Sequence, residues 1–387
     1  MATPAPERVP DRGTSDRVAR GVIEVLVFVV VPCCLLLVIA FFAPRATYAS
    51  DFHPFWQAAG DVVHGRNPYT HAVTFNSLGT PESRYIYPPA VADLLVPLAP
   101  LPFLAAAIAF LLVSTAAIPL ALWLLGVRDW RCYGTVFLWI PVVHGIRLGA
   151  LTPLLILGIA ACWRYRDSAV ASSLAAAPVV VTKIFMWPLL VWQAERGTPR
   201  IIRSIALSLV GFTLLPWATI GFKGLVGYPK LLNNEASFWD RGYSLSALGT
   251  TVGFPGTASR LAATALALAA CAGLVLARRR KLIDDREALA LAIGIAIVFS
   301  PVSWLHYSAL LLVAAALLSP RLSAAWLLPL GFWISPFEEA DGTVWRILFV
   351  LALDVLTLAV LIRGYRSAPE RSTTTTRLPR AALRLQQ

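Results

Sequence analysis

The sequence predicts an all-α protein that crosses a membrane many times, and three observations support this fold class. Of the 387 residues, 58% are hydrophobic and only 14% are charged, whereas about a quarter of the residues of a soluble domain are charged. Apolar stretches long enough to span a bilayer recur along the chain. The basic residues stand in short clusters between these stretches, which is how helix bundles fix their orientation in a membrane.

Apolar stretches of two lengths make up the predicted bundle. Those that match the roughly 17–25 residues of a transmembrane helix are 21–43, 103–125, 203–222, 259–277 and 343–362. The shorter ones, separated by proline, glycine or charge, are 132–146, 148–163, 168–182, 184–195, 286–300, 305–318 and 321–337. All of them together give twelve, so we expect about 10–12 transmembrane or half-spanning helices. The first stretch is too long for a signal-peptide core and lacks a cleavage site, so we expect it to be retained.

The distribution of basic residues predicts the orientation. With the N-terminus inside, 23 of the 33 basic residues fall on the inner side, although the longer loops lie outside. We therefore expect a cytoplasmic N-terminal tail (1–20), a transmembrane domain (21–362) with outer loops at 44–102 and 223–258, and a disordered, basic cytoplasmic tail (363–387). The 29 arginines against four lysines, with abundant alanine, indicate a GC-rich bacterial genome and hence a bacterial plasma membrane.

Composition argues against two other classes of protein. The net charge of +12 is scattered among the spans, so we expect lipids and not nucleic acid as the partner of these basic residues. The five cysteines form no C-x-x-C or Cys/His spacing, so the sequence indicates no zinc site and no disulfide framework. We expect neither a metal nor a cofactor.

The stretch "SDFHPFWQAAGDVVHGRNPY" follows the first span, and it predicts a helix lying along the membrane surface. Pro54 disfavours a helical His53, so the helix should begin at Pro54 and end near Gly65. Asp51 precedes this helix, where its carboxylate can either cap the helix or project into a site. Asp61 is expected on the polar face of the helix, opposite its apolar face.

Two further polar patches fall on the same predicted outer side. The segment "RYIYPPAVADLLVPLAPLPF" carries Tyr85 and Tyr87 among prolines that break an apolar run. It can be a rigid connector with interfacial tyrosines, or it can line a substrate cavity. His306 lies in "SPVSWLHYS" at the outer end of a span, where an interfacial or hydrogen-bonding role competes with a catalytic one.

Two ionisable residues lie inside apolar stretches. Lys183, in "VVVTKIFMW", is a candidate functional residue because unpaired charge in a membrane is costly; alternatively, it snorkels to the headgroups. Asp354, in the middle of the last span, has no such escape, and the sequence does not name its partner.

The order of these patches resembles glycosyltransferase family 87, a family of bacterial membrane enzymes of the GT-C type. The motifs that carry the resemblance are an Asp after the first span (Asp51), G-x-x-P-Y (65–69), Y-P-P (87–89) and S-P-x-S-W-x-H (300–306), and together they cover roughly residues 20–320. Two positions depart from the family pattern. Gly149 is followed by Ala150 where the family often has Gln or Asn, and Lys183 is followed by Ile184 where Lys-Pro is usual.

The resemblance implies a glycosyltransferase that uses a polyprenyl-phosphate sugar from the outer leaflet, mannose first and arabinofuranose as the alternative, with a glycolipid or polysaccharide as acceptor. It implies Asp51 as the general base, Lys183 beside the lipid phosphate, and His306 as a group that orients the acceptor or protonates the phosphate. His53, Tyr69, Tyr85 and Tyr87 are the remaining expected substrate-binding residues.

Two functions of other classes stay open at this point. The first is a transporter or flippase of lipid-linked sugars, although transporters tend to carry internal repeats and midplane polar residues. The sequence shows no repeat, and Asp354 is the one clearly central charge. The second is a catalytically inactive scaffold.

Overall fold

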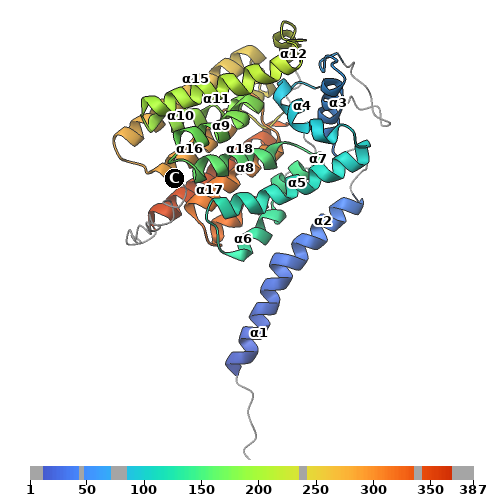
Figure 1. Ribbon diagram of the computed structural model, residues 1–387. Coiled ribbons are helices and arrows are strands. Elements are labelled where there is room, and N and C mark those ends of the chain that lie inside the picture. The colour runs from blue at the N-terminus through green and yellow to red at the C-terminus, as the bar shows by residue number, and fades with distance from the viewer. Residues whose placement is uncertain (1–11, 43–47, 71–84, 235–241, 335–341, 368–387) are drawn as a thin grey trace, which may run out of the picture.

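A computed structural model describes residues 12–42, 48–70, 85–234, 242–334 and 342–367. Those residues contain many helices and no strand, and five helices are long and apolar enough to cross a membrane. The all-α, polytopic fold class is therefore confirmed. Most helices pack into one bundle, while the first stands away from it (Figure 1).

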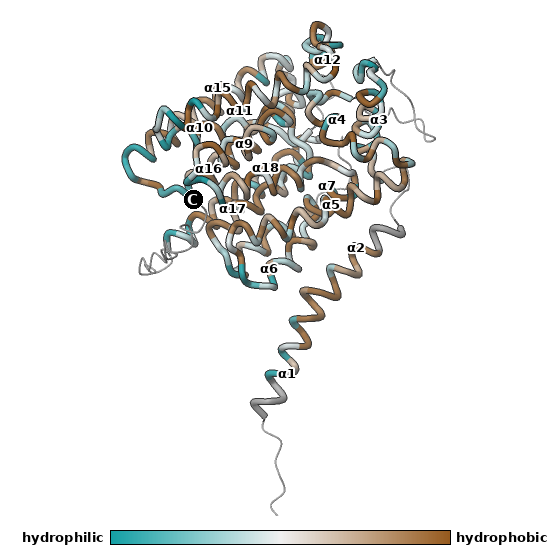
Figure 2. Tube along the Cα trace, viewed as in Figure 1, coloured by the Kyte–Doolittle hydropathy of each residue, from teal (hydrophilic) through white to brown (hydrophobic). Residues whose placement is uncertain are grey.

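The first helix is continuous through α1 (Arg12–Val25), the π-helical turn η1 (Leu26–Val30) and α2 (Val31–Phe42). It meets the bundle chiefly at one place, where η1 crosses α6 (Trp130–Thr135). There a Cβ on Gly134 would lie 1.8 Å from the Phe28 carbonyl oxygen, so only glycine permits this approach. Between Val22 and Leu37 the helix exposes apolar side chains, and Figure 2 shows this stretch mainly in the hydrophobic colour, as expected for a surface that faces lipid.

The other long helices form the outside of the bundle. They are α5 (Phe103–Leu124), α11 (Pro199–Thr219), α15 (Gly256–Arg279) and α18 (Val344–Ser367). Each exposes large apolar side chains. Because α18 continues to Ser367, the prediction of a disordered tail from residue 363 is wrong for 363–367; residues 368–387 lie outside the described part of the chain.

Shorter helices fill the interior, as the short apolar stretches predict. These are η4 (Val136–Leu138), α7 (Ile140–Leu148), α8 (Thr152–Arg164), α9 (Ala169–Thr182), η5 (Ile184–Met186), α10 (Pro188–Glu195), α16 (Asp285–Val298), η6 (Leu305–Leu310), α17 (Leu311–Leu318), η7 (Ala324–Trp326) and η8 (Leu328–Ile334). Every residue of α17 is buried. Helices α7 and α8 bend by 115° at a short break, so this pair is a broken span or a re-entrant loop.

Small helices of the two long predicted loops gather at one end of the bundle. They are α3 (Phe52–Val63), α4 (Pro89–Leu95), η3 (Val96–Leu98), α12 (Tyr228–Asn234) and α14 (Leu245–Thr251). Helix α3 begins at Phe52, not at Pro54 as predicted. A proline in the first turn costs nothing there, because the N–H that it lacks has no partner within the helix.

Asp61 is not on an exposed polar face of α3. Its side chain is only 3% exposed, and Oδ1 accepts a hydrogen bond from Arg66 Nε at 2.8 Å. The prediction failed because Arg66 lies beyond the end of the helix, where helical periodicity gives no information about its position. Asp61 stabilises the turn that follows α3.

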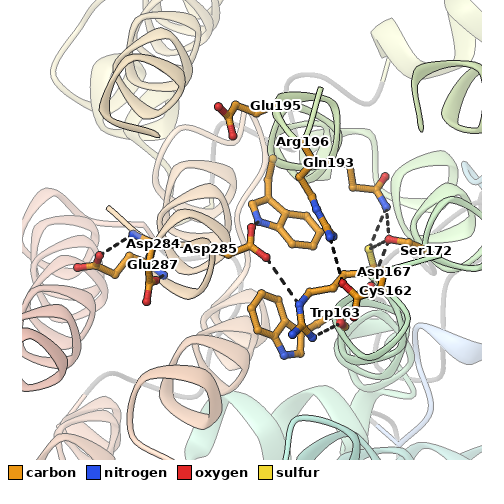
Figure 3. A network of polar contacts seen from close by, with 12 residues as sticks. Cys162, Trp163, Asp167, Ser172, Gln193, Glu195, Arg196, Asp284, Asp285 and Glu287 are labelled. Carbon is orange, nitrogen blue, oxygen red and sulfur yellow. Dashed lines mark hydrogen bonds and ion pairs between the residues drawn. The ribbon is translucent and has the colours of Figure 1, made fainter. Parts of the chain in front are cut away.

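The opposite end of the bundle is joined by charged side chains. We call this group the arginine network; it consists of Arg166, Arg196 and Arg278 with Asp167, Glu195 and Asp285. It connects the ends of α8 and α10 to α15 and α16, and Figure 3 shows most of its members. Asp285 is the centre of the network: it lies 3.7 Å from Arg166 and 3.5 Å from Arg278, and it accepts a hydrogen bond from Trp192 Nε1 at 3.0 Å.

Candidate active site

Lys183 lies where α9 stops and the chain turns into η5. Its backbone leaves the helical region (φ −132°, ψ 89°), and its side chain reaches two tyrosines from distant parts of the sequence. Nζ donates to Tyr87 Oη at 2.5 Å and to Tyr307 Oη. It also lies 4.5 Å and 4.8 Å from the centres of the two rings. The ammonium group is thus fixed in position by two phenols, with hydrogen bonds and ring faces acting together.

Tyr87 is held in place through its backbone. Tyr69 donates its phenol hydrogen to the carbonyl oxygen of Tyr87, and Tyr228 donates to that of Ile86, both at 2.9 Å. Burial raises the pKa of Tyr69 and of Tyr228 above the ordinary value, so both phenols stay protonated and act as donors. The Tyr87 ring packs edge-on against Phe55 of α3 at 4.8 Å. One loop and two helices, α3 and α12, therefore determine where the Tyr87 hydroxyl meets Lys183.

Tyr85 supports the same Tyr87 segment through hydrogen bonds to the backbone that follows it. It is buried, donates to the carbonyl oxygen of Pro88 at 2.6 Å and accepts from the amide of Ala92 at 3.1 Å. Its hydroxyl, like that of Tyr69, is engaged with the backbone. Direct contact of Tyr69 or Tyr85 with a substrate stays a prediction.

Asp51 lies at the N-terminus of α3, pinned to the end of α7. Its amide donates to Leu148 O and the amide of Ala49 donates to Arg147 O, both at 2.9 Å. Gly149 permits this contact, because its φ of +69° is left-handed and a Cβ there would lie 2.7 Å from Phe52 Cβ. The Asp51 side chain makes no capping bond to α3. Capping therefore does not explain this carboxylate.

His306 is buried against Gly145 of α7. Its Cβ would lie 3.2 Å from a Cβ on Gly145, and its ring lies 6.5 Å from that of His144. His144 Nδ1 in turn lies 3.2 Å from Arg147 Nη2. A guanidinium group only donates, so Nδ1 of His144 is the acceptor. The next residue along the chain, Tyr307, is the one that holds Lys183.

Backbone hydrogen bonds, side-chain hydrogen bonds and neighbouring rings thus connect several predicted residues with Arg147 and Tyr307. We call this group the Lys183 site; it consists of Asp51, Tyr87, Arg147, Lys183, His306 and Tyr307. His53 is placed differently: its ring packs edge-on against Phe103 at 5.0 Å and lies near Trp56. These contacts are made two residues from Phe55, on another side of α3, and substrate binding by His53 stays a prediction.

The family of the chain follows from a sequence comparison. The family model of glycosyltransferase family 87 matches residues 85–301, more than half of the chain. The chain belongs to glycosyltransferase family 87. No curated protein and no solved structure matches it. The resemblance to family 87 is therefore confirmed, and with it a multi-pass membrane protein that acts as a glycosyltransferase.

The matched part of this family 87 glycosyltransferase covers some of the Lys183 site and not the rest. It includes Tyr87, Arg147 and Lys183, whereas Asp51 precedes it and His306 follows it. The match therefore gives no information about Asp51 or His306. Their place in the site comes from the contacts above.

Sequence reasoning missed two members of this site, Arg147 and Tyr307, and the neighbouring His144. Arg147 had a usable signal, because it is a cation at the joint between two apolar stretches. Tyr307 had only its position beside His306. Among the described residues, no group of three or more His, Cys, Asp or Glu could hold a metal ion, and the expectation that the enzyme needs no metal or cofactor stays a prediction.

Proposed function

We propose that this glycosyltransferase moves a sugar, mannose first, from a polyprenyl-phosphate donor to a glycolipid or polysaccharide acceptor. The observation that carries the proposal is that the Asp51 segment is bonded to the end of α7, which carries the Arg147 cation, while Tyr87 and Tyr307 hold a second cation, Lys183. The resemblance noted in the sequence supports the lipid-phosphate donor, with arabinofuranose as the alternative sugar.

The reaction places one demand on each end of the sugar. A hydroxyl oxygen of the acceptor forms a bond to the anomeric carbon, while the bond from that carbon to the phosphate oxygen breaks and the phosphate leaves with the electron pair. The acceptor proton goes to Asp51, and such general-base help is worth about two to four orders of magnitude. Lys183, together with Arg147, stabilises the negative charge that develops on the phosphate.

His306 and the tyrosines complete the proposed site. His306 orients the acceptor or donates a proton to the departing phosphate. Tyr87 and Tyr307 fix the Lys183 ammonium before substrate arrives, so that little reorganisation is needed during the reaction.

We also propose that the Lys183 site faces the outside of a bacterial plasma membrane and that both termini are cytoplasmic, because 23 of 33 basic residues then lie inside. In a variant without native cysteines, a cysteine at exposed Asn233, in α12, should react with an impermeant reagent in intact cells. A cysteine at exposed Arg279 should react only after lysis. The reverse pattern would overturn this orientation.

Sugar transfer by the purified protein tests the function directly. In detergent, the enzyme should transfer radiolabelled mannose from a synthetic polyprenyl-phosphate mannose to a glycolipid acceptor, without nucleotide or ATP, and Asp51→Asn should not. Flipping of the donor across vesicles without transfer would instead support the transporter alternative. Transfer of arabinofuranose alone would change the sugar and keep the mechanism.

A further inference from the structure

Asp354 is a buried carboxyl group in the middle of α18, one of the predicted spans. It is 3% exposed, and its Oδ2 accepts a hydrogen bond from the Ser308 hydroxyl at 3.2 Å. Its Oδ1 has no hydrogen-bond partner among the described residues. An ionisable group within a membrane is costly and is a functional candidate by default. The proposed reaction does not use it.

Ser308 connects this carboxyl group to the Lys183 site. It belongs to η6, a 3₁₀-helix of six residues, and follows His306 and Tyr307 directly. A 3₁₀-helix has three residues per turn, so residues three apart point the same way and their neighbours point in two other directions. Such an element has three sides.

Each side of η6 packs against a different part of the bundle. Leu305 and Ser308 face α18: Leu305 is buried in one cluster with Ile347 and Val350, and Ser308 bonds to Asp354. The other two sides carry the site residues. His306 lies against Gly145 of α7, and Tyr307 stacks on Phe185 at 4.8 Å and holds Lys183.

The 3₁₀ form of η6 needs support from outside. Its hydrogen bonds are poorer than those of an α-helix, and η6 runs directly into α17, an α-helix that it could extend. Conversion to α-helix would turn the chain by about 20° per residue, and by about 100° at His306, five residues before α17. His306 and Tyr307 would then leave α7 and Lys183.

We propose that Asp354 is a positioning residue: by accepting the Ser308 hydroxyl, it holds η6 in the register that presents His306 and Tyr307 to the Lys183 site. The effect on catalysis rests on the proposed function, whereas the effect on η6 does not. An oxygen acceptor at this position is what the role requires; a negative charge is not.

Two substitutions of Asp354 separate the acceptor from a mere packing role. Asp354→Leu removes the acceptor and keeps the number and branching of the side-chain heavy atoms, and it should lower kcat about ten- to hundredfold, the usual cost of a displaced catalytic group. Its melting temperature should not fall, because an apolar side chain replaces a costly buried polar one. Asp354→Asn keeps an oxygen acceptor and should retain kcat within about twofold of the wild type.

Hydrogen exchange provides a readout that does not depend on activity. In nanodiscs, Asp354→Leu and Ser308→Ala should both raise amide exchange in residues 305–310, and the double variant should exchange no faster than either single variant. Thr357→Val is the matched control. Its hydroxyl is buried on α18, one turn away, without a partner among the described residues, and its loss should change neither kcat nor exchange.

Three results would overturn the proposal. The first is wild-type kcat and exchange in Asp354→Leu. The second is an Asp354→Asn variant as inactive as Asp354→Leu, because the charge or the proton would then be the essential feature. The third is a fall in melting temperature that parallels the loss of activity, which would indicate a structural role only. If the wild-type enzyme transfers no sugar, the proposed function fails, and the exchange results still decide the role of Asp354.

Discussion

The two ends of the same short helices are built with different chemistry. At one end, the arginine network pairs each of its three guanidinium groups with carboxylates. At the other, Lys183 is held by two phenols, and Arg147 lies against an imidazole. There, the backbone carbonyls of Ile86 and Tyr87 accept hydrogen bonds from tyrosine hydroxyls.

The groups that hold a cation at each end suggest what that cation does. Carboxylates that pair with arginines join four helix ends and neutralise the arginine charges locally. Such pairing suits a purely structural role. Phenols and imidazoles orient a cation with dipoles and ring faces. A cation oriented in that way fits the proposal that Lys183 stabilises the phosphate of the donor. Substitutions at the two ends should therefore give different phenotypes.

The largest expected effect is the loss of the Asp51 carboxylate. Asp51→Asn keeps the size of the side chain and removes its basicity, so transfer activity should fall at least about a hundredfold. The melting temperature should stay within a few degrees, because the backbone bonds of Asp51 are kept and its side chain does not cap α3. Steady-state kinetics and thermal unfolding in detergent measure the two quantities.

Asp167→Asn is the matched control for this change. Asp167 is a carboxylate that pairs with Arg196, but its side chain is 86% exposed and lies in the arginine network. It should keep full activity. An active, normally folded Asp51→Asn enzyme would end the general-base mechanism.

The next effect concerns the cation. Lys183→Ala removes the charge that the phenols orient, and it should reduce kcat/KM for the donor about ten- to a hundredfold while changing acceptor KM little. Lys183→Arg keeps the charge and should recover part of the loss. Unchanged donor kinetics in the alanine variant would return Lys183 to a snorkelling role.

A smaller effect is expected from the tyrosines that hold the Tyr87 segment. Tyr69→Phe and Tyr228→Phe each remove one hydrogen bond to a carbonyl oxygen, which costs about 1 kcal/mol each. Each should lower transfer several-fold, and the double variant should lose less than the product of the two, because both hydroxyls hold consecutive carbonyls. Strictly independent losses measured in this double-mutant cycle would contradict a shared role.

The sequence predicts the broad structure better than the local structure. Apolar stretches give the helices, and the cost of charge in a membrane singles out Lys183 and Asp354. The partners cannot be predicted, because Tyr87 and Tyr307 lie 96 and 124 residues from Lys183 and no periodicity relates them. The start of α3 and the burial of Asp61 are missed for a different reason: each depends on what happens at an end of helix α3, where local rules are weakest.

In the arginine network, Asp285→Asn should affect stability and not catalysis. It removes the carboxylate that lies near both Arg166 and Arg278. We expect a loss of about 1 kcal/mol, the upper end for partly exposed ion pairs, seen as a lower melting temperature with unchanged kcat. A large loss of activity at normal stability would show that the two ends are coupled.

The smallest expected effect is a pH dependence of the stability, and it comes from a carboxyl group outside the membrane spans, that of Asp129. Asp129 caps α6, and its ion pair and hydrogen bonds with Arg131 lower the pKa of its carboxyl from 3.8 to about 2. The folded state therefore gains stability from this carboxylate at pH values above 3.8 and loses it as the pH falls through about 2. The melting temperatures of the wild type and Asp129→Asn should differ at pH 6 and converge near pH 2. A constant difference across this range would contradict the assignment.

The long separation between Lys183 and Tyr307 also sets the order of events during synthesis. The ribosome must add a further 124 residues after Lys183 before Tyr307 exists, which takes about 6 to 25 seconds at about 5–20 residues per second. Throughout that interval Tyr87 is already made and can hold the lysine. A chain that stops short of η6 can insert most of its helices and still has no complete site, so catalytic competence is among the last properties that the nascent enzyme acquires.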